Sequence, residues 1–335
     1  MKVLWTTTEP EAGMLLVSPL QRALQDHGVS VTTLRLGPAQ TPKAVYAARR
    51  TVRERAAGFD IIHAQKGSSC ALASVPTGGR PFMVTLRGSD WNLYSASAHP
   101  LVWKTRFARM MSRIAIRHAS MVICVSHRMR TDVSRHFPDD RTIVLPTPID
   151  LTALPEPPRD RIAARKSLAP LLNPLAPWVL FNSFYARNPI KRIFLARAAI
   201  DAARRRMSQP VELVTVTGLP HAHALTLASL CDLILSTSTA EGWPNCVKEA
   251  LACDVPFVAT DTSDLHRIAS IEPRCRIAAA DPDALGQAIE ESLQAPRHPS
   301  RSLRTHVDSM SMPITAQRLV DTYAMILNEH TFRPC

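Results

Sequence analysis

The sequence lacks the signatures that would assign it to several large enzyme classes. No Gly-x-Gly-x-x-Gly follows the first strand-like run, which argues against a nicotinamide cofactor, and no Walker-type phosphate loop is present. The one Asp-x-Asp, at Asp281-Pro282-Asp283, opens a helical pattern and is typical of a helix cap. No His-rich cluster occurs either. We therefore expect a reaction that uses no metal ion and no bound cofactor.

Uninterrupted membrane spans and paired cysteines are missing too. Two charge-free runs, 167–186 and 213–231, approach the roughly 20 residues that a span needs, but prolines and histidines interrupt them. The N-terminus lacks the long apolar region and the small-residue cleavage site of a secretory signal. The seven cysteines are odd in number and include no Cys-x-x-Cys pair, which predicts reduced thiols. We expect a globular protein of the cytoplasm.

The whole chain has a net charge of +12, and most of this positive charge lies in its first half. Residues 1–150 hold 20 Lys and Arg against 10 Asp and Glu, whereas residues 151–335 hold 20 against 18. A basic half favours a polyanion or an anionic membrane as partner. Coding bias toward arginine, with 33 Arg against 7 Lys, would produce the same excess.

Short apolar runs alternate with helix-period segments, a pattern typical of parallel sheets flanked by helices. Strands are expected at 2–6, 30–34, 60–63, 82–86, 121–125 and 142–145, and again at 178–182, 212–217, 233–236 and 256–259. The pattern predicts a doubly wound α/β domain over 1–150, a proline-rich linker over 151–176 and a second such domain over 177–312. A last helix within 313–335 could cross back to the first domain. Two facing α/β domains would bind ligands at the carboxyl ends of their strands, in the cleft between them.

The segment from Glu241 to Asp261 carries the most specific chemistry. A buried-type strand at 233–236 leads through a short polar loop to Glu241, which we therefore expect to point into the cleft. Gly242 lets the backbone approach a ligand closely, and Pro244 suits the first position of a helix. Glu249 follows one to two helical turns later, about 6–8 Å along the axis.

The amides at the start of this helix complete the predicted site. The free N–H groups of Trp243, Asn245 and Cys246 can face outward as donors to an anion. Two carboxylates on either side of an anion-binding turn suit a ligand with hydroxyls at both ends and phosphates between them, such as a nucleoside-diphosphate sugar. The alternative is structural: Glu241 caps a loop and Glu249 lies on a solvated helix face.

The order of these residues resembles the signature of a known family. The run Glu241–Pro244, followed by Glu249 and the strand at 256–259, is similar to the motif of retaining GT-B glycosyltransferases of the family 4 (group 1) class. The resemblance implies that Glu249 holds the ribose hydroxyls of the donor and that Glu241 meets the hydroxyls of the donor sugar. It also implies that the amides between them meet the diphosphate and the sugar.

Two cations after the strand at 178–182 extend the resemblance. Lys191 resembles the family's diphosphate lysine, and Arg187 resembles its arginine partner at a shorter spacing than usual. Cations here can neutralise the charge that builds on the leaving group as the sugar departs. A solvated basic helix start is the alternative for both residues.

The strand at 82–86 ends in Arg87-Gly88-Ser89-Asp90, which is similar to the family's strand followed by His-Gly-x-Asp. The family's histidine meets the donor sugar and diphosphate, and Arg87 stands in its place. An arginine can hydrogen-bond a phosphate or a sugar, but it cannot act as a base near neutral pH. We expect Arg87 at the catalytic centre, and Gly13 and Asp90 on the acceptor side. A surface arginine beside an ordinary turn is the alternative.

Weaker matches continue along the chain. Asp60–Ala64 resembles the family's Asp-Val-Ile-His-Ala strand, although a lone histidine such as His63 is more typical of a core. The segment 101–118 is amphipathic, and its two adjacent stripes are Arg106, Arg109, Arg113 and Arg117, and Trp103, Phe107, Met110 and Ile114. A basic stripe can dock on anionic lipid, at about 1 kcal/mol per charge. An ordinary helix, with its core on one side, is the alternative.

Taken together, the motifs predict a GT-B glycosyltransferase with two Rossmann-like domains facing across a cleft. It would move a sugar from a nucleotide donor to a hydroxyl of a glycan or lipid-linked acceptor, with retention of configuration, in surface polysaccharide synthesis. We expect a cytoplasmic location, at the inner membrane face if the basic helix docks there, and no nucleic-acid partner. Two alternatives stay open: a non-catalytic glycosyltransferase-like binding subunit, and a GT-B-fold sugar-nucleotide epimerase.

Overall fold

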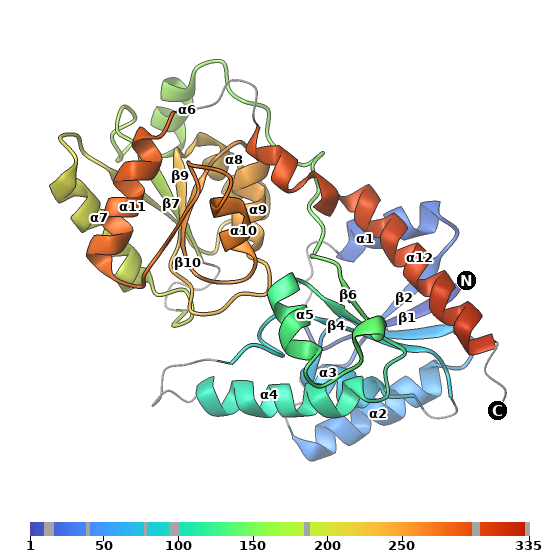
Figure 1. Cartoon of the computed structure of the whole chain (residues 1–335). Coiled ribbons are helices and arrows are strands. Elements are labelled where there is room, and N and C mark those ends of the chain that lie inside the picture. The colour runs from blue at the N-terminus through green and yellow to red at the C-terminus, as the bar shows by residue number, and fades with distance from the viewer. Residues whose placement is uncertain are drawn as a thin grey trace. The chain divides into compact units, whose positions relative to one another are not determined.

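The computed structural model describes residues 1–9, 17–37, 41–76, 79–93, 101–183, 188–296 and 302–331. The chain forms two compact units, one of Met1–Pro148 together with Met310–Cys335 and one of Ile149–Ser309 (Figure 1). The C-terminal helix therefore belongs to the first unit. Residues 151–176, expected as a linker, lie within the second unit.

The first unit is built on a six-stranded parallel sheet. Its strands are β1 (Lys2–Thr7), β2 (Ser30–Arg35), β3 (Ile61–Ala64), β4 (Phe82–Leu86), β5 (Met121–Cys124) and β6 (Thr142–Val144), in the spatial order β2-β1-β3-β4-β5-β6. In the register of β1, Val3 lies opposite Val31 on one side and Ile61 on the other. Each apolar run predicted in this half forms one strand.

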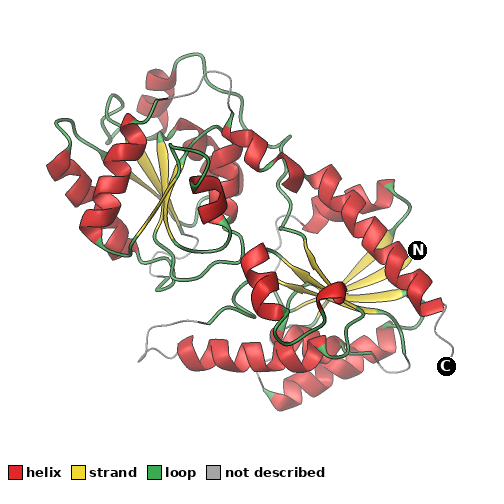
Figure 2. Ribbon diagram, in the orientation of Figure 1, coloured by secondary structure: helices red, strands yellow, loops and turns green. Residues whose placement is uncertain are grey.

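Helices cover both faces of this sheet (Figures 1 and 2). They are α1 (Val17–Asp26), α2 (Pro42–Arg55), α3 (Ser68–Ser74), α4 (Leu101–Ile116), α5 (His127–Val133) and α12 (Met312–Thr331), with a 3-10 turn at Asp139–Arg141. Side chains of β1 alternate between two cores. Val3 and Trp5 pack with α1 and α12, whereas Leu4 packs with α2, α3, α4 and α5. This alternation follows from the two-residue period of a strand.

Helix α12 is tied to the first sheet through a buried polar network. Trp5 Nε1 donates to the Tyr323 hydroxyl at 2.8 Å, and that hydroxyl lies 2.7 Å from His63 Nδ1. His63 Nε2 lies 2.8 Å from Thr85 Oγ1. His63, Trp5 and Tyr323 are all at most 1% exposed, so His63 is a core histidine.

The network fixes the proton on His63. Burial, together with the nearby charge of Arg87, lowers the pKa of His63 to about 3, so the ring is neutral. Its Nδ1 faces two donors, the Tyr323 hydroxyl and Gln65 Nε2 at 3.2 Å, and must accept. The proton therefore lies on Nε2 and is donated to Thr85.

The second unit contains a five-stranded parallel sheet. Its strands are β7 (Trp178–Asn182), β8 (Glu212–Val216), β9 (Leu233–Ser236), β10 (Phe257–Thr260) and β11 (Arg276–Ala278), in the spatial order β11-β10-β9-β7-β8. Its helices are α6 (Arg161–Leu168), α7 (Ile193–Arg206), α8 (His221–Leu230), α9 (Asn245–Ala252), α10 (Leu265–Ala269) and α11 (Pro282–Gln294), with 3-10 turns at Leu303–His306 and Asp308–Met310.

Helices α7 and α11 approach each other closely on one face of this sheet. A Cβ on Gly286 of α11 would lie 2.6 Å from Ala202 Cβ and 2.9 Å from the backbone nitrogen of Ala203. Real Cβ atoms do not come this close, so glycine is required where the two helices meet. Larger side chains here would push α11 away from α7.

Helix α6 is held to the second unit by Arg165, which is buried. Its guanidinium donates to the carbonyls of Leu230 and Ala176 and to the Asp232 carboxylate at 2.6 Å, and it stacks over the Trp178 ring at 4.8 Å. These bonds explain why a segment that reads as a linker is packed against the second sheet.

We predict that Tyr323→Phe lowers the free energy of unfolding by about 1–3 kcal/mol, because the Trp5 N–H then lacks its partner inside the core. Urea denaturation measures the loss. Thr322→Val on the same helix is the control, since the Thr322 hydroxyl donates to the Arg318 carbonyl of its own helix. Equal losses in the two variants would contradict a special role for the network.

Candidate functional site

The second unit gathers polar side chains at the carboxyl edge of its sheet. Lys191 follows β7, and Glu241 follows the neighbouring strand β9. Lys191 Nζ lies 2.5 Å from Glu241 Oε1, and Ser238 Oγ donates to the same oxygen at 2.6 Å. The side chains of Lys191 and Glu241 are 23% and 15% exposed. Fold topology thus brings together two residues that sequence analysis assigned to one site.

Hydrogen bonds from side chains to backbone carbonyls fix the two loops that carry this ion pair. Thr237 Oγ1 donates to the Lys191 carbonyl at 2.6 Å, and Arg192 Nε donates to the Thr237 carbonyl at 2.5 Å. Arg192 has a φ of 54°, a left-handed conformation that costs a residue with a side chain about 1–2 kcal/mol. The surrounding bonds hold it there and aim Lys191 at Glu241. Sequence analysis missed Arg192, because nothing in its neighbours indicates a left-handed residue.

The ion pair determines the charge of Lys191. Burial alone would lower the pKa of Lys191, but the Glu241 carboxylate attracts the ammonium and accepts a hydrogen bond, so the net result is a raised pKa. Lys191 is therefore a cation at neutral pH. A fixed cation in a shielded place can stabilise negative charge on a phosphate more strongly than it could in water.

Trp243 packs into the unit and leaves only its backbone for a ligand. The side chain is 6% exposed, and Lys248 Nζ lies 5.7 Å from the centre of its ring. Ser263 Oγ donates to the Gly242 carbonyl at 2.5 Å and holds the turn against the loop after β10. The predicted donor contact of Trp243 is therefore limited to main-chain atoms.

Helix α9 begins at Asn245, with Pro244 as its N-cap. Pro244 was predicted at the first helical position and stands one residue earlier. The amides of Asn245 and Cys246 precede the first intrahelical hydrogen bonds, so they are available as donors at the helix N-terminus. Asn245 is exposed, which leaves this end of α9 open to an anion.

Glu249 meets a histidine that sequence analysis missed. His221 opens α8 after β8, and its Nε2 lies 2.9 Å from Glu249 Oε1. This bond, and then the charges of Glu249 and Asp150, raise the pKa of His221 against the opposing effect of burial. Glu249 is 14% exposed, so it is neither solvated nor unpartnered. The one feature of the sequence that could have indicated His221 as a site residue is the Gly-Leu-Pro-His run that follows a strand.

In the first unit, Arg87 follows β4 and is hydrogen-bonded to Gln65, the residue after the neighbouring strand β3. Its Nε donates to the Gln65 carbonyl at 2.5 Å and its Nη2 to Gln65 Oε1 at 2.8 Å. Burial lowers the pKa of Arg87, while Glu9 and Asp90 oppose this effect. Arg87 is half-buried, and it is a donor without acceptor capacity.

Asp90 is a structural residue of this loop. Its carboxylate is 1% exposed and accepts from the amides of Gly67 at 2.7 Å, Gly88 at 2.8 Å and Arg87 at 3.0 Å. The carboxylate is closed off from solvent, and the acceptor-side place of Asp90 stays a prediction. The sequence pattern located the turn but could not show that Asp90 faces inward.

The predicted basic stripe of α4 is divided in the structure. Arg109 forms an ion pair with Asp132 and stacks over the Trp91 ring at 4.9 Å, so it faces the first unit. Arg113 is half-buried and bonds to His136. Arg106 and Arg117 are exposed. The period of the helix placed four arginines together, but only two of them face solvent fully.

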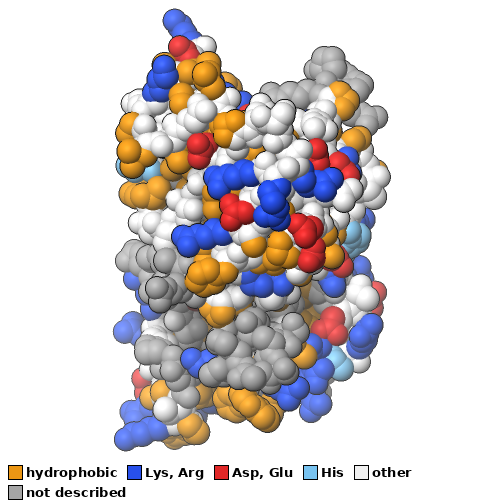
Figure 3. Space-filling model, turned by 90° about the vertical axis from the view of Figure 1, so that its left-hand side faces the viewer, with side chains coloured by type: hydrophobic (Ala, Val, Ile, Leu, Met, Phe, Trp, Pro, Cys, Tyr) orange, Lys and Arg blue, Asp and Glu red, His pale blue; other side chains and the backbone are white. Residues whose placement is uncertain are grey.

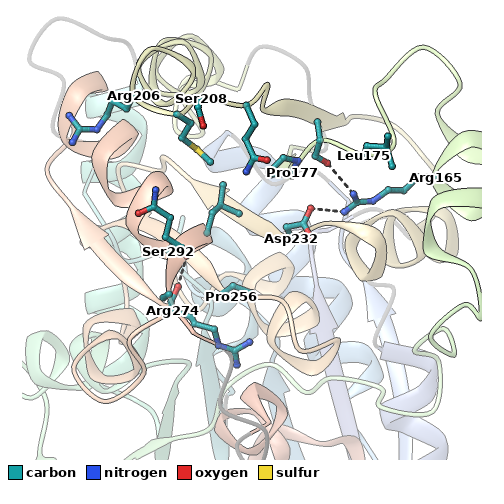
Figure 4. A pocket seen from close by; sticks show the side chains of 15 residues that line it. Arg165, Leu175, Pro177, Arg206, Ser208, Asp232, Pro256, Arg274 and Ser292 are labelled. Carbon is teal, nitrogen blue, oxygen red and sulfur yellow. Dashed lines mark hydrogen bonds and ion pairs between the residues drawn. The ribbon is translucent and has the colours of Figure 1, made fainter.

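A cavity of about 510 Å³ lies in the second unit at the opposite, amino edge of the sheet (Figure 4). Pro177 and Pro256, which precede β7 and β10, line it together with Asp232, which precedes β9. Arg165 and Asp232 face each other there through an ion pair. This cavity is separate from the Lys191–Glu241 site, because that pair follows the carboxyl ends of the same sheet.

Two predicted site residues, Gly13 and Arg187, lie outside the described residues. Within the part of the chain that the structure describes, no group of three His, Cys, Asp or Glu side chains could hold a metal ion. No helix among those same residues is long and apolar enough to cross a membrane.

Comparisons with known proteins indicate the family of the chain. A family model described as Glycosyltransferase Family 4 matches residues 9–153, and one described as Glycosyl transferases group 1 matches residues 193–295. The chain belongs to these glycosyltransferases. The second match includes Glu241 and Glu249, and it begins just after Lys191.

The chain is similar to TuaC of Bacillus subtilis (strain 168), which is named as a teichuronic acid biosynthesis glycosyltransferase. The two are 27% identical over 260 residues, which cover 72% of this chain and 64% of TuaC. The chain thus spans less than two thirds of the length of that relative.

Solved glycosyltransferase structures share the fold. Sucrose-phosphate synthase of Thermosynechococcus elongatus matches with a TM-score of 0.76 and 16% identity, over 98% of this chain and 100% of the other. HepE of Anabaena in complex with UDP matches with a TM-score of 0.65 and 17% identity, over 97% and 100% of the two chains. The fold is GT-B, with two Rossmann-like units.

We predict that the His221–Glu249 pair makes stability depend on pH. A histidine whose folded pKa is raised contributes stability below its unfolded pKa and loses that contribution as pH rises through its folded pKa. His221→Gln should therefore cost about 0.5 kcal/mol at pH 5.5 and nothing at pH 9, a small value because solvent screens the pair. Urea denaturation at both pH values measures this.

His266→Gln is the matched control for that experiment. His266 lies 3.9 Å from Asp261 and is 55% exposed, so it should show no such difference between the two pH values. A His221→Gln effect that is the same at pH 5.5 and pH 9 would contradict the charged pair.

Proposed function

We propose that this protein transfers a sugar from a nucleoside-diphosphate sugar to a hydroxyl of a glycan or lipid-linked acceptor, with retention of anomeric configuration. The observation that carries the proposal is the grouping of Lys191, Glu241 and Glu249 around the N-terminus of α9. Lys191 and Glu241 follow the carboxyl ends of parallel strands, which is where α/β units bind ligands, and Glu249 lies within the helix that starts just after Glu241.

The grouping fits each part of such a donor. Lys191 and the amides at the start of α9 suit a diphosphate, since both offer positive charge and N–H donors. Glu241 suits the hydroxyls of the sugar. Glu249 suits the ribose hydroxyls, with His221 holding the carboxylate in place. The UDP bound to HepE is a nucleotide of this class.

Same-face attack is the proposed route to retention. The alternative is a covalent intermediate, which needs a nucleophile near the sugar. Glu241 is engaged by Lys191 and Ser238, and burial raises the pKa of the Cys246 thiol to about 11, so neither is activated. In the proposed step the bond from the sugar carbon to the phosphate oxygen breaks while the acceptor oxygen bonds to the same face. The acceptor proton moves to the leaving phosphate.

Lys191 is the reason why the proposed reaction needs no metal ion. As the sugar departs, negative charge develops on the diphosphate, and a cation already fixed next to Glu241 can stabilise that charge without a metal ion. Arg87 can donate to a phosphate or a sugar but cannot accept a proton. We therefore assign Arg87 no part in proton transfer. The likeness to TuaC supports a place in surface polysaccharide synthesis.

A panel of nucleotides and nucleotide sugars should identify the donor. We predict that the correct donor raises the melting temperature by roughly 5–10 °C at about 100 times its dissociation constant, because it binds only the folded protein. Differential scanning fluorimetry measures the shift. No shift with any nucleoside diphosphate or its sugars would overturn the proposed donor class.

Product analysis on the shifted donor then separates the alternatives. Transfer to an added acceptor supports the proposal. Conversion of the donor without acceptor would indicate an epimerase, and binding without any turnover across an acceptor panel would indicate a non-catalytic subunit. NMR of the product's anomeric centre tests retention, and inversion would overturn the proposed step.

We predict that Glu241→Ala abolishes transfer while the protein stays folded, and that Lys191→Ala lowers kcat/KM by about 10²–10³ through lost stabilisation of the leaving group. Glu290→Ala is the matched control. Glu290 is also in the second unit, 19% exposed and paired with Arg206 at 2.6 Å, but it lies on α11, away from the site. An equal loss of activity in Glu290→Ala would show that any broken ion pair has this effect.

A further inference from the structure

Helix α4 presents large apolar side chains to solvent. Trp103 is 72%, Phe107 54%, Met110 48% and Ile114 41% exposed. Spaced three and four residues apart, they fall within an arc of about 60° at about 100° per residue. We call these four residues the apolar stripe. An isolated exposed apolar residue is ordinary, but four on one helix face form a continuous surface.

The apolar stripe lies on the side of α4 that faces away from the sheet. The buried side of the helix consists of Thr105, Met111, Ser112, Ala115 and Ile116. Ser112 and Ala115 are 0% exposed, and Ser112 Oγ donates to the Asp90 carbonyl at 2.7 Å. The helix is thus apolar on both sides, and only one of these sides is used by the fold.

Cations border the apolar stripe, and α4 carries no acidic residue at all. Lys104 is exposed on one flank and Arg106 on the other, and Arg117, the first residue after the helix, is also exposed. The Arg106 guanidinium stacks over the Trp103 ring at 5.5 Å. A helix that is apolar along its centre and cationic along its flanks is typical of one that lies in a membrane interface.

Helix α2 lies in the same helical layer and is also basic. It packs against α3, which in turn packs against α4, on one side of the first sheet (Figure 1). Its sequence holds five cations and a single acid, Glu54, which pairs with Arg50. At the lower end of Figure 3, at the height of α2 and α4 in Figure 1, hydrophobic side chains lie among Lys and Arg. Tyr46 of α2 is 72% exposed.

We propose that the apolar stripe of α4 docks on an anionic lipid surface, with Trp103 and Phe107 inserted at the level of the headgroups. Lys104, Arg106 and Arg117 would then meet lipid phosphates, and tryptophan is the side chain that favours this depth. A second copy of the chain fits less well, because two such faces would bring like charges together. The proposal concerns the first unit alone and does not depend on the donor chemistry of the second.

Vesicle co-sedimentation tests the charge requirement. The protein should bind vesicles of phosphatidylcholine with 30% phosphatidylglycerol, bind pure phosphatidylcholine far more weakly, and lose binding as salt is raised. The triple variant Lys104→Gln, Arg106→Gln and Arg117→Gln should bind the anionic vesicles about 100-fold more weakly, from about fivefold per charge. The matched control changes the same residue types on the second unit, at the exposed positions Lys166, Arg197 and Arg267. Equal losses in the two triple variants would reduce the effect to net charge and overturn the proposal.

A second pair of variants tests how much the apolar side chains contribute to vesicle binding. Trp103→Ala with Phe107→Ala should weaken binding at least tenfold without lowering the melting temperature, because both side chains are exposed. Phe194→Ala with Leu171→Ala, at positions 71% and 97% exposed in the second unit, is the control and should bind like the wild type. Unchanged binding in the Trp103 and Phe107 double variant would overturn insertion.

Tryptophan fluorescence reports the depth of insertion. All five tryptophans lie in the described residues, and the other four are at most 6% exposed, so Trp103 alone can report a change of solvent. Vesicles should shift its emission to the blue, and brominated lipids should quench it. Trp103→Leu should lose both signals and still co-sediment.

Two further outcomes would overturn the proposal. In one, light scattering shows that the wild type is a dimer, this dimer does not bind vesicles, and Phe107→Glu converts it to a monomer. That result would assign the apolar stripe to contact with a second copy. The other is failure to bind anionic vesicles at low salt by a folded monomer, which would leave the stripe for a protein partner.

Discussion

The ion pair between Lys191 and Glu241 is the interaction on which the site of the second unit depends. Each side chain alone would be a partly buried charge without compensation, and such a charge is expensive. Their loops leave adjacent strands, and Arg192, in a left-handed conformation, bonds one loop to the other. The sheet thus holds both charges at a fixed separation, ready for a ligand that carries charge and hydroxyls. Preorganisation of this kind is what an electrostatic site requires.

Two histidines show how environment determines what the same side chain does. His63 is enclosed by Trp5 and Tyr323 and is neutral, so it serves as a hydrogen-bonding link within a core. His221 stands at the start of a helix beside Glu249, which favours its protonated form. Sequence alone treats both as isolated histidines. Their roles follow from burial in one case and from a carboxylate in the other.

Much of the fold could be predicted from the sequence, because buried parallel strands read as apolar runs. The short strand β11 was missed, since few residues carry little periodic signal. The Glu241 to Glu249 motif was found because its chemistry is local. Contacts between segments that are distant in the sequence, such as the contact of His221 with Glu249, could not be found in this way. For α4, periodicity located the apolar stripe but could not tell which side faces the core, and the buried side is the one that holds Ser112.

The return of α12 to the first unit affects the order in which the chain can fold during synthesis. Tyr323 and its neighbours complete a core that also holds Val3, so that core stays open until α12 has left the ribosome. The second unit is continuous in sequence and can close earlier. The first unit, although its strands are made before the second unit, therefore finishes folding after it. Until then its apolar face is the surface that a chaperone would have to cover.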